Sequence, residues 1–347
     1  MKRALFYEHR MKKIIICFLG LFAGASHATN GINLIGFGAE STLMAGADIA
    51  VARDTSALNT NPAGLTQIKT KRFDAYGSLL RITDLSHEDQ FGNDRHASNL
   101  YTGLGDMACT VAGGLFAQGG SGGVFENMQT AFATEDEYSG LFAVGKLTAG
   151  VGCEIIDKWS VGGSFGLVYA QAEQKIFPDT SAPPAFAGIE IDDATSLRTS
   201  FKLGIQYRAT PKLTLAASYT GKTELPLTDG ELKLNQTGAG LGIVKYDDVS
   251  LKGLALPEEI GVGAAYRYND KLTLYSGYNY GKNPIPKEHT NPVVAGIFDH
   301  HLTFGGSYQY NSEWTFYGGI EYDFRKKVNY TNSELPFGND SQLRNEA

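Results

Sequence analysis

Two serines flanked by glycines have the spacing of a hydrolase nucleophile. Gly162-Gly163-Ser164-Phe165-Gly166 and Gly119-Gly120-Ser121-Gly122-Gly123 both match the Gly-x-Ser-x-Gly pattern. In that pattern the serine attacks an ester from a strand-to-helix turn. Ser164 falls in the middle of a predicted strand, and a chain with 42 glycines produces such matches by chance. A lipid hydrolase is therefore kept only as a minor alternative.

Histidine and cysteine offer little further chemistry. None of the 7 histidines forms the His-x-x-x-His pair that holds a metal on a helix. His300-His301 begins a predicted strand, where one of the two rings faces inward. We therefore predict no metal, no cofactor and no catalytic residue. Cys109 and Cys153 fall on adjacent predicted strands, and both a disulfide and two free thiols remain open.

Composition and charge exclude several classes of protein. The net charge of -7 leaves no basic surface for a polyanion, so nucleic acid is not an expected partner. An apolar fraction of 42% with 11% aromatic residues argues against disorder. Glycine supplies 42 of 347 residues, well above its usual share. The sequence predicts a folded, glycine-rich chain.

The first residues have the pattern of a secretory signal. Lys12 and Lys13 precede an apolar run over residues 14–22, and small residues follow up to Ala28. We expect residues 1–28 to be this signal. The remaining chain has no apolar run long enough for a transmembrane helix. An integral membrane protein could then only be a closed barrel.

The rest of the chain alternates with a period of two residues, which is typical of strands. Long strands, small or polar residues on one face and tyrosines at the strand ends favour a membrane barrel over a soluble sandwich. Short turns such as Asn269-Asp270-Lys271 alternate with long polar connections such as Pro178–Ala194 and Lys282–Asp299, which places the short turns in the periplasm. The predicted strands are 73–85, 96–107, 108–118, 139–156, 159–177, 195–210, 212–230, 244–254, 258–269, 271–282, 300–310 and 313–328.

Residues 29–70 have a different pattern. An alanine-rich stretch from Ser41 to Arg53 predicts a short helix, and Asn61-Pro62-Ala63-Gly64-Leu65 closes a second short turn. Together with Gly36-Phe37-Gly38-Ala39 and Met44-Ala45-Gly46-Ala47, this motif resembles the N-terminal hatch of FadL/TodX-type outer-membrane transporters of hydrophobic compounds. The resemblance continues through Gly277–Pro284 and covers nearly the whole chain after the signal.

The resemblance implies an all-β fold, an antiparallel transmembrane β-barrel of about 12–14 strands. Residues 71–347 would form the barrel and residues 29–70 a helical hatch in its lumen. The polar end at 342–347 leads us to expect that the last strand is lacking. The implied location is the outer membrane of a Gram-negative bacterium, where a monomer contacts outer-membrane lipid and lipopolysaccharide.

The implied function is passive uptake of a hydrophobic small molecule, with release sideways past a kinked third strand. Long-chain fatty acids are the first expectation, aromatic hydrocarbons the alternative, and a surface-protein assembly partner a more distant one. The hatch motif comprises Asn61, Pro62, Ala63 and Gly64. Candidate pocket-lining residues are Phe116, Phe142, Val144, Val168 and Tyr275.

Four cations also fall on inward-facing positions. Lys146, Lys202, Arg208 and Arg267 could bind a carboxylate, or pair with Glu154, Glu321 and Asp323. Glycine weakens strand pairing and permits bulges. Candidates for the strand kink are Gly119, Gly120, Gly122 and Gly123, with a flexible glycine loop as the alternative.

Overall fold

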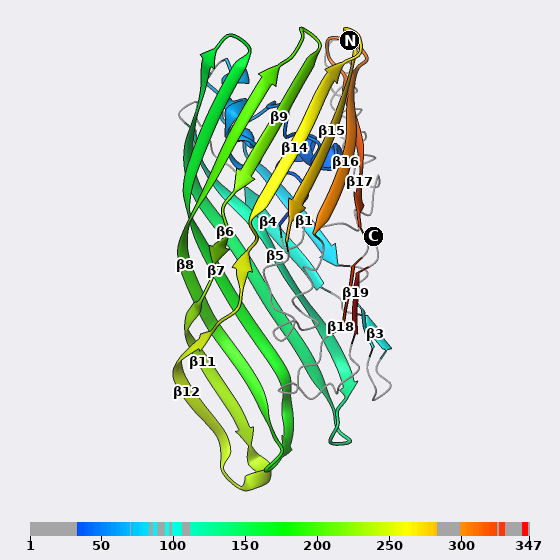
Figure 1. Ribbon diagram of the computed structural model, residues 1–347. Helices are drawn as coiled ribbons and strands as arrows, with labels where there is room; N and C mark the ends of the chain where they lie inside the picture. The colour runs from blue at the N-terminus through cyan, green and yellow to red at the C-terminus, as the bar shows by residue number, and fades with distance from the viewer. Residues whose placement is uncertain are drawn as a thin grey trace, which may run out of the picture.

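The computed structural model is a long, curled antiparallel sheet with an N-terminal segment, residues 33–69, against its inner side (Figure 1). It describes residues 33–69, 71–82, 86–88, 94–96, 99–105, 112–282, 299–324, 326–329 and 342–345. The predicted signal at 1–28 lies outside the described residues. The architecture is all-β, as the alternation predicts.

The main sheet has the strand order β17-β16-β15-β14-β9-β8-β7-β6-β5, and β11 and β12 extend it from β8. Its longest members, β6 to β8, have more than 20 residues each. The strands are β5 Ala112–Gln129, β6 Glu135–Ile156, β7 Trp159–Ala182, β8 Phe186–Arg208, β9 Leu213–Thr220, β11 Leu227–Gln236, β12 Gly242–Leu251, β14 Glu259–Arg267, β15 Leu272–Gly281, β16 His300–Gln309 and β17 Thr315–Asp323.

Smaller sheets connect the two ends of the chain. β19 pairs with both β18 and β2, so segments from opposite ends of the sequence lie side by side (Figure 1). The remaining strands are β1 Tyr76–Ile82 with β4 Asn99–Gly105, β2 Ser86–Glu88 with β3 Asp94–His96, β18 Lys326–Asn329 with β19 Gln342–Asn345, and β10 Thr223–Glu224 with β13 Ala255–Leu256.

Large apolar side chains of the main sheet are exposed and many small or polar ones are buried, which is the reverse of the pattern in a soluble protein. On β7 the rings of Phe165 and Tyr169 are 59% and 48% exposed on the convex face, whereas Ser164 and Val168 are buried on the concave face. The same alternation leaves large apolar side chains exposed on most strands of the main sheet. Such an apolar outer face requires lipid around it. Among the described residues, no helix is long and apolar enough to cross a membrane.

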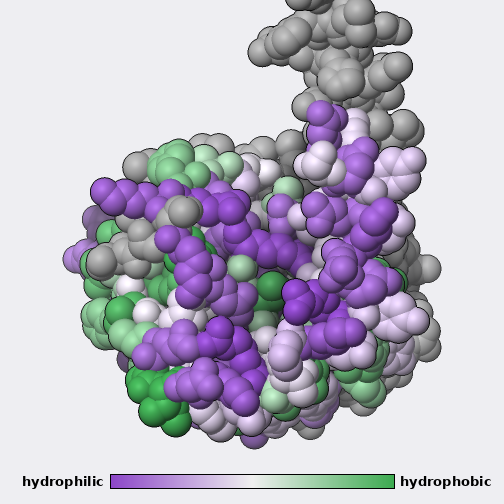
Figure 2. Space-filling model, turned by 90° about the horizontal axis from the view of Figure 1, so that it is seen from above, coloured by the Kyte–Doolittle hydropathy of each residue, from purple (hydrophilic) through white to green (hydrophobic). Residues whose placement is uncertain are grey.

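The two ends of the sheet differ. At the upper end of Figure 1, Arg267 donates a backbone hydrogen bond to Lys212, and Gln309 donates one to Lys271, so successive short turns lie side by side. Seen from above, hydrophilic side chains gather across this end and hydrophobic ones lie toward the outer edge (Figure 2). The β11–β12 hairpin extends from the opposite end. Short turns at one end and a long extension at the other agree with the predicted difference between the two ends.

Two local predictions and one alternative are wrong. The connection predicted at Pro178–Ala194 is mostly strand, because β7 continues to Ala182 and β8 begins at Phe186. The glycines from Gly119 to Gly123 lie within β5, so the flexible loop does not form. The helix predicted from Ser41 to Arg53 ends at Leu43, since Ala45 and Gly46 have positive φ and turn the chain back. Most of the predicted connection Lys282–Asp299 lies outside the described residues.

Candidate binding site

The Asn61-Pro62-Ala63-Gly64 motif lies against the inner wall of the sheet. Asn61 is the N-cap of the 3-10 helix η1 (Pro62–Gln67), and its side-chain oxygen accepts from Ala63 N at 3.1 Å. Its amide donates to the carbonyls of Ile49 at 2.9 Å and Ala217 on β9 at 3.3 Å. Proline suits the first position of the helix, where no N–H is needed. One buried amide therefore links two parts of the N-terminal segment to the wall.

Glycines in the wall make this close approach possible. A methyl group at Gly162 would lie 2.3 Å from the carbonyl carbon of Pro62, and one at Gly204 would lie 1.9 Å from Oδ1 of Asn61. A side chain at Gly162 therefore displaces the backbone of η1, and one at Gly204 displaces at least the side chain of Asn61. Part of the glycine excess is thus explained by the N-terminal segment packing directly on β7 and β8.

Lys146 on β6 and Lys202 on β8 come together at the N-terminal segment. Lys146 Nζ donates to Asn59 Oδ1 at 3.1 Å, and Lys202 Nζ donates to the main-chain oxygens of Asn59 at 2.8 Å and Thr60 at 3.2 Å. Lys146 is buried. Among the described residues neither ammonium has a carboxylate within ion-pair distance. Two neighbouring cations are therefore held by neutral oxygens.

A polar cavity of about 60 Å³ lies between the N-terminal segment and the wall. It has room for only a few water molecules. Glu259 on β14, which accepts a hydrogen bond from Asn33, lines it together with Lys202. Its other polar lining residues include Asp48, Asn59, Gln118, Asn279, Thr303 and Glu321.

The five predicted pocket-lining residues fall into three separate apolar clusters. Phe142, Val144 and Val168 share one, with Leu225 and Leu227 packed on them. Phe116 contacts Phe37 of the N-terminal segment, with ring centroids 5.7 Å apart. Tyr275 lies in a third cluster, under the guanidinium of Arg53 at 4.4 Å. All five point inward, but they do not line one common pocket.

The two arginines do not join the lysines. Arg208 is exposed at the end of β8, where it forms an ion pair with Glu154 on β6. Arg267 is exposed at the end of β14 and donates to the carbonyl of Pro211 at 2.9 Å. The expected alternative, an ion pair within the protein, thus holds for Arg208 and Glu154. Neither arginine lines the cavity.

The candidate kink glycines follow an irregularity in β5. Its pairing with β6 shifts register between Ala117 and Gly119, so Gln118 is an extra residue in the strand. The N-terminal segment bonds there: Leu34 N donates to the Gln118 carbonyl at 3.2 Å, and Asn59 donates to the Gln118 side chain at 2.9 Å. The contacts of Asn33, Asn59 and Gln118 were not predicted, because isolated amides carry no pattern.

The serine and cysteine candidates have simpler positions. Ser164 lies in the middle of β7 and Ser121 within β5, so neither occupies a strand-to-helix turn. Cys153 is an exposed free thiol on β6. Cys109 lies outside the described residues.

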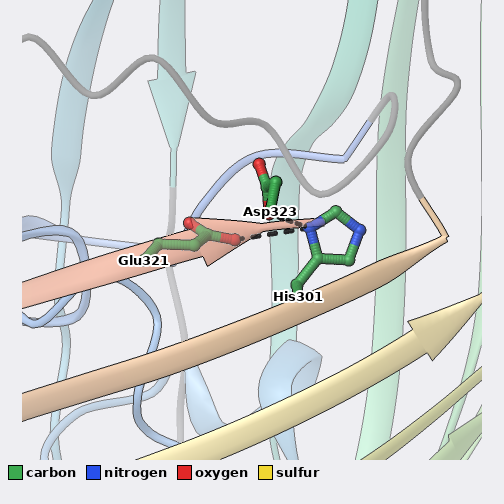
Figure 3. A group of neighbouring side chains, drawn as sticks. All are labelled: His301, Glu321 and Asp323. Atoms are coloured by element: carbon green, nitrogen blue, oxygen red, sulfur yellow. Dashed lines mark hydrogen bonds and ion pairs between the residues drawn. The ribbon is translucent and has the colours of Figure 1, made fainter. Parts of the chain in front are cut away.

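A buried cluster of His301, Glu321 and Asp323 was also missed (Figure 3). His301 Nδ1 forms a hydrogen bond with Asp323 and lies 3.6 Å from Glu321 Oε1. His301 is 20 and 22 positions away from the two acids in the sequence, and only the pairing of β16 with β17 brings it to them. No spacing rule could have found them.

Asp48 in the N-terminal segment is a buried acid. Burial raises the pKa of its carboxyl to about 6, against a hydrogen bond from Ser41 that lowers it. Above pH 6 the folded protein therefore keeps a buried charge that the unfolded chain would expose to water.

We expect Asp48→Asn to stabilise the protein at pH 8, by up to about 2–3 kcal/mol. The folded state binds the proton more tightly than the unfolded state does, so the penalty disappears as the pH falls from about 6 to about 4. Thermal unfolding of wild type and variant at pH 8 and pH 4 measures this difference. An equal difference in Tm at both pH values would contradict the prediction.

A curled antiparallel sheet with an apolar outer face and an N-terminal segment inside defines a β-barrel protein of the outer membrane. The chain belongs to the family of outer membrane protein transport proteins (OMPP1/FadL/TodX), whose model matches residues 21–338. By family it is thus an outer-membrane transport protein.

Solved structures with the same fold include other members of this family. The toluene transporter TodX of P. putida is 19% identical, with 90% of this chain and 95% of that chain covered and a TM-score of 0.62. The toluene transporter TbuX of Ralstonia pickettii is 20% identical over 87% and 91% of the two chains, also at 0.62. A Pseudomonas aeruginosa FadL homologue is 12% identical over 90% and 96%, at 0.54. No curated protein matches the chain.

Proposed function

We propose that this protein takes up long-chain fatty acids through the outer membrane. The observation that carries the proposal is the pair formed by Lys146 and Lys202, whose ammonium groups bond, among the described residues, only to neutral oxygens of Asn59 and Thr60. Holding two like charges side by side inside the protein with no carboxylate in direct contact is costly. An anionic headgroup would relieve that cost, and a hydrocarbon would not.

An apolar surface begins directly beside this headgroup site. Lys146 is the cross-strand partner of Val168, and Val144 precedes it on the same face of β6. Both valines belong to the buried cluster that includes Phe142, Leu225 and Leu227. A molecule with a carboxylate at the lysines and an alkyl chain along this cluster would satisfy both surfaces.

Movement of the N-terminal segment is part of the proposal. The cavity of about 60 Å³ is too small for a fatty acid while residues 33–69 stay in place. A carboxylate that binds Lys146 and Lys202 competes with the oxygens of Asn59 and Thr60 for the same ammonium groups. Binding of the cargo would therefore favour a state in which this segment, acting as the hatch, is released.

We place release beside β5, the edge strand of the main sheet. The bulge at Gln118 and the four glycines after it weaken pairing at this edge. The cargo would pass sideways there into the outer leaflet, without an energy source.

Aromatic hydrocarbons are the second candidate cargo. TodX and TbuX, described as toluene transporters, share this fold, and a hydrocarbon needs only the apolar clusters. The two candidates differ in one respect, which is whether the lysines contribute to binding.

Binding of three probes to the purified protein separates the candidates. We expect hexadecanoic acid to bind at least about tenfold more tightly than its methyl ester, because charge-assisted hydrogen bonds contribute about 1.5–3 kcal/mol. Toluene should compete weakly. Equal affinity for acid and ester would exclude the headgroup site, and preferential binding of toluene would favour the hydrocarbon cargo.

A further inference from the structure

We propose that His301, Glu321 and Asp323 bind a divalent transition-metal ion, with zinc as the best-suited one. The proposed ligands include none of the residues proposed to bind the cargo. It lies on the inner face of β16 and β17, where the three side chains point toward one another (Figure 3).

Strand register puts the ligands in place. His301 is the cross-strand partner of Asp323, and Thr303 is the partner of Glu321, so all four side chains lie on one face of the strand pair. One ligand atom from each of His301, Glu321 and Asp323 lies within 4.8 Å of the other two. A strand pair holds such a set more rigidly than a loop.

The cluster has unused acceptors. The side chains of His301, Glu321 and Asp323 are only 2%, 6% and 0% exposed. Yet Glu321 Oε2 and Asp323 Oδ2 have no hydrogen-bond partner among the described residues, and neither does Thr303 Oγ1 beside them. Buried carboxylate oxygens without donors are costly and rare. These oxygens point to a ligand that accepts their lone pairs.

The negative charge of the cluster favours binding of a divalent cation over binding of a single proton. Two ionised carboxylates would carry two negative charges, and no lysine or arginine of the described residues forms an ion pair with either. A protonated imidazole would compensate only one of these charges. A divalent ion bound by two carboxylates and a neutral imidazole leaves the cluster neutral.

The donor set indicates the type of ion. Imidazole nitrogen with carboxylate oxygen is a common ligand combination for zinc, which accepts three protein ligands and a water. Thr303 and Glu321 also line the polar cavity, so the site adjoins space for water. The bound ion would tie β17 to β16.

Zinc titration of the purified full-length barrel, stripped with a chelator, tests the proposal. We expect one zinc per chain by calorimetry and by elemental analysis. Glu321→Gln and Asp323→Asn, which preserve side-chain shape, should each weaken binding at least about tenfold. His300→Asn is the matched control: it makes a similar change one residue away, where His300 bonds to Tyr278 instead, and should bind zinc as wild type does.

Cobalt provides a test that needs no variant. Co²⁺ in the wild-type site should give visible absorption bands of a four- or five-coordinate nitrogen–oxygen site, and zinc should abolish them. Absence of stoichiometric zinc binding would overturn the proposal and leave a buried ion pair. Equal zinc affinity in wild type, Glu321→Gln and Asp323→Asn would also overturn it, since the ion would then be bound elsewhere.

Discussion

Gly162→Val is expected to turn the protein into an open pore. The new side chain would occupy space already filled by Pro62 and Ala63, whose atoms lie 2.3–2.4 Å from the position of a Cβ. β7 is paired on both sides along its length and cannot retreat. The N-terminal segment must therefore leave the wall, and Asn61 loses its hydrogen bonds to Ile49 and Ala217.

Single-channel conductance in planar bilayers measures the effect. Wild type should conduct ions poorly, because residues 33–69 fill the inside, whereas Gly162→Val should show a large, steady conductance. Gly318→Val is the matched control, since a Cβ at Gly318 of β17 meets nothing within 4 Å. If Gly162→Val stays as closed as Gly318→Val, the N-terminal segment is not the plug.

Replacing both Lys146 and Lys202 with methionine is expected to abolish the preference for a carboxylate. Methionine keeps most of the side-chain volume and removes two buried charges, so the barrel should remain folded. Loss of charge-assisted hydrogen bonds should weaken hexadecanoate binding about 10–100-fold. Binding of the methyl ester should change little.

Substitution of an exposed lysine provides the control for this experiment. Lys245 on β12 pairs with Glu231 in the hairpin at the far end of the molecule, so Lys245→Met should bind hexadecanoate as wild type does. Unchanged acid binding by the double variant would refute the role of the lysine pair. It would leave the hydrocarbon cargo as the better account.

Much of the fold could be predicted from the sequence, because the barrel wall has a simple period. Alternation of large apolar with small residues around Phe165 and Val168 predicts the two faces of β7, and the structure confirms both. The same period placed Lys146 correctly inside. It could not show that Asn59 is its partner, since that contact joins positions 87 residues apart.

The errors have physical causes. Arg208 and Arg267 occupy alternate positions that face inward along the rest of their strands. Both stand at strand ends, however, where the side chains reach water. The β7–β8 hairpin was cut short because its pairing shifts register between Ile176 and Ser181, which interrupts the alternation along the strands. The cluster of His301, Glu321 and Asp323 depends on strand register, which turns and side-chain packing determine together.

Uptake by living cells tests the central claim most directly. Gram-negative cells that lack their own fatty-acid transporter would express this protein, and the entry of labelled hexadecanoate would be followed over time. We predict saturable uptake that exceeds the vector control, is inhibited by unlabelled hexadecanoate and falls strongly in the Lys146→Met, Lys202→Met double variant. Uptake equal to the vector control, with the protein folded in the outer membrane, would contradict the account.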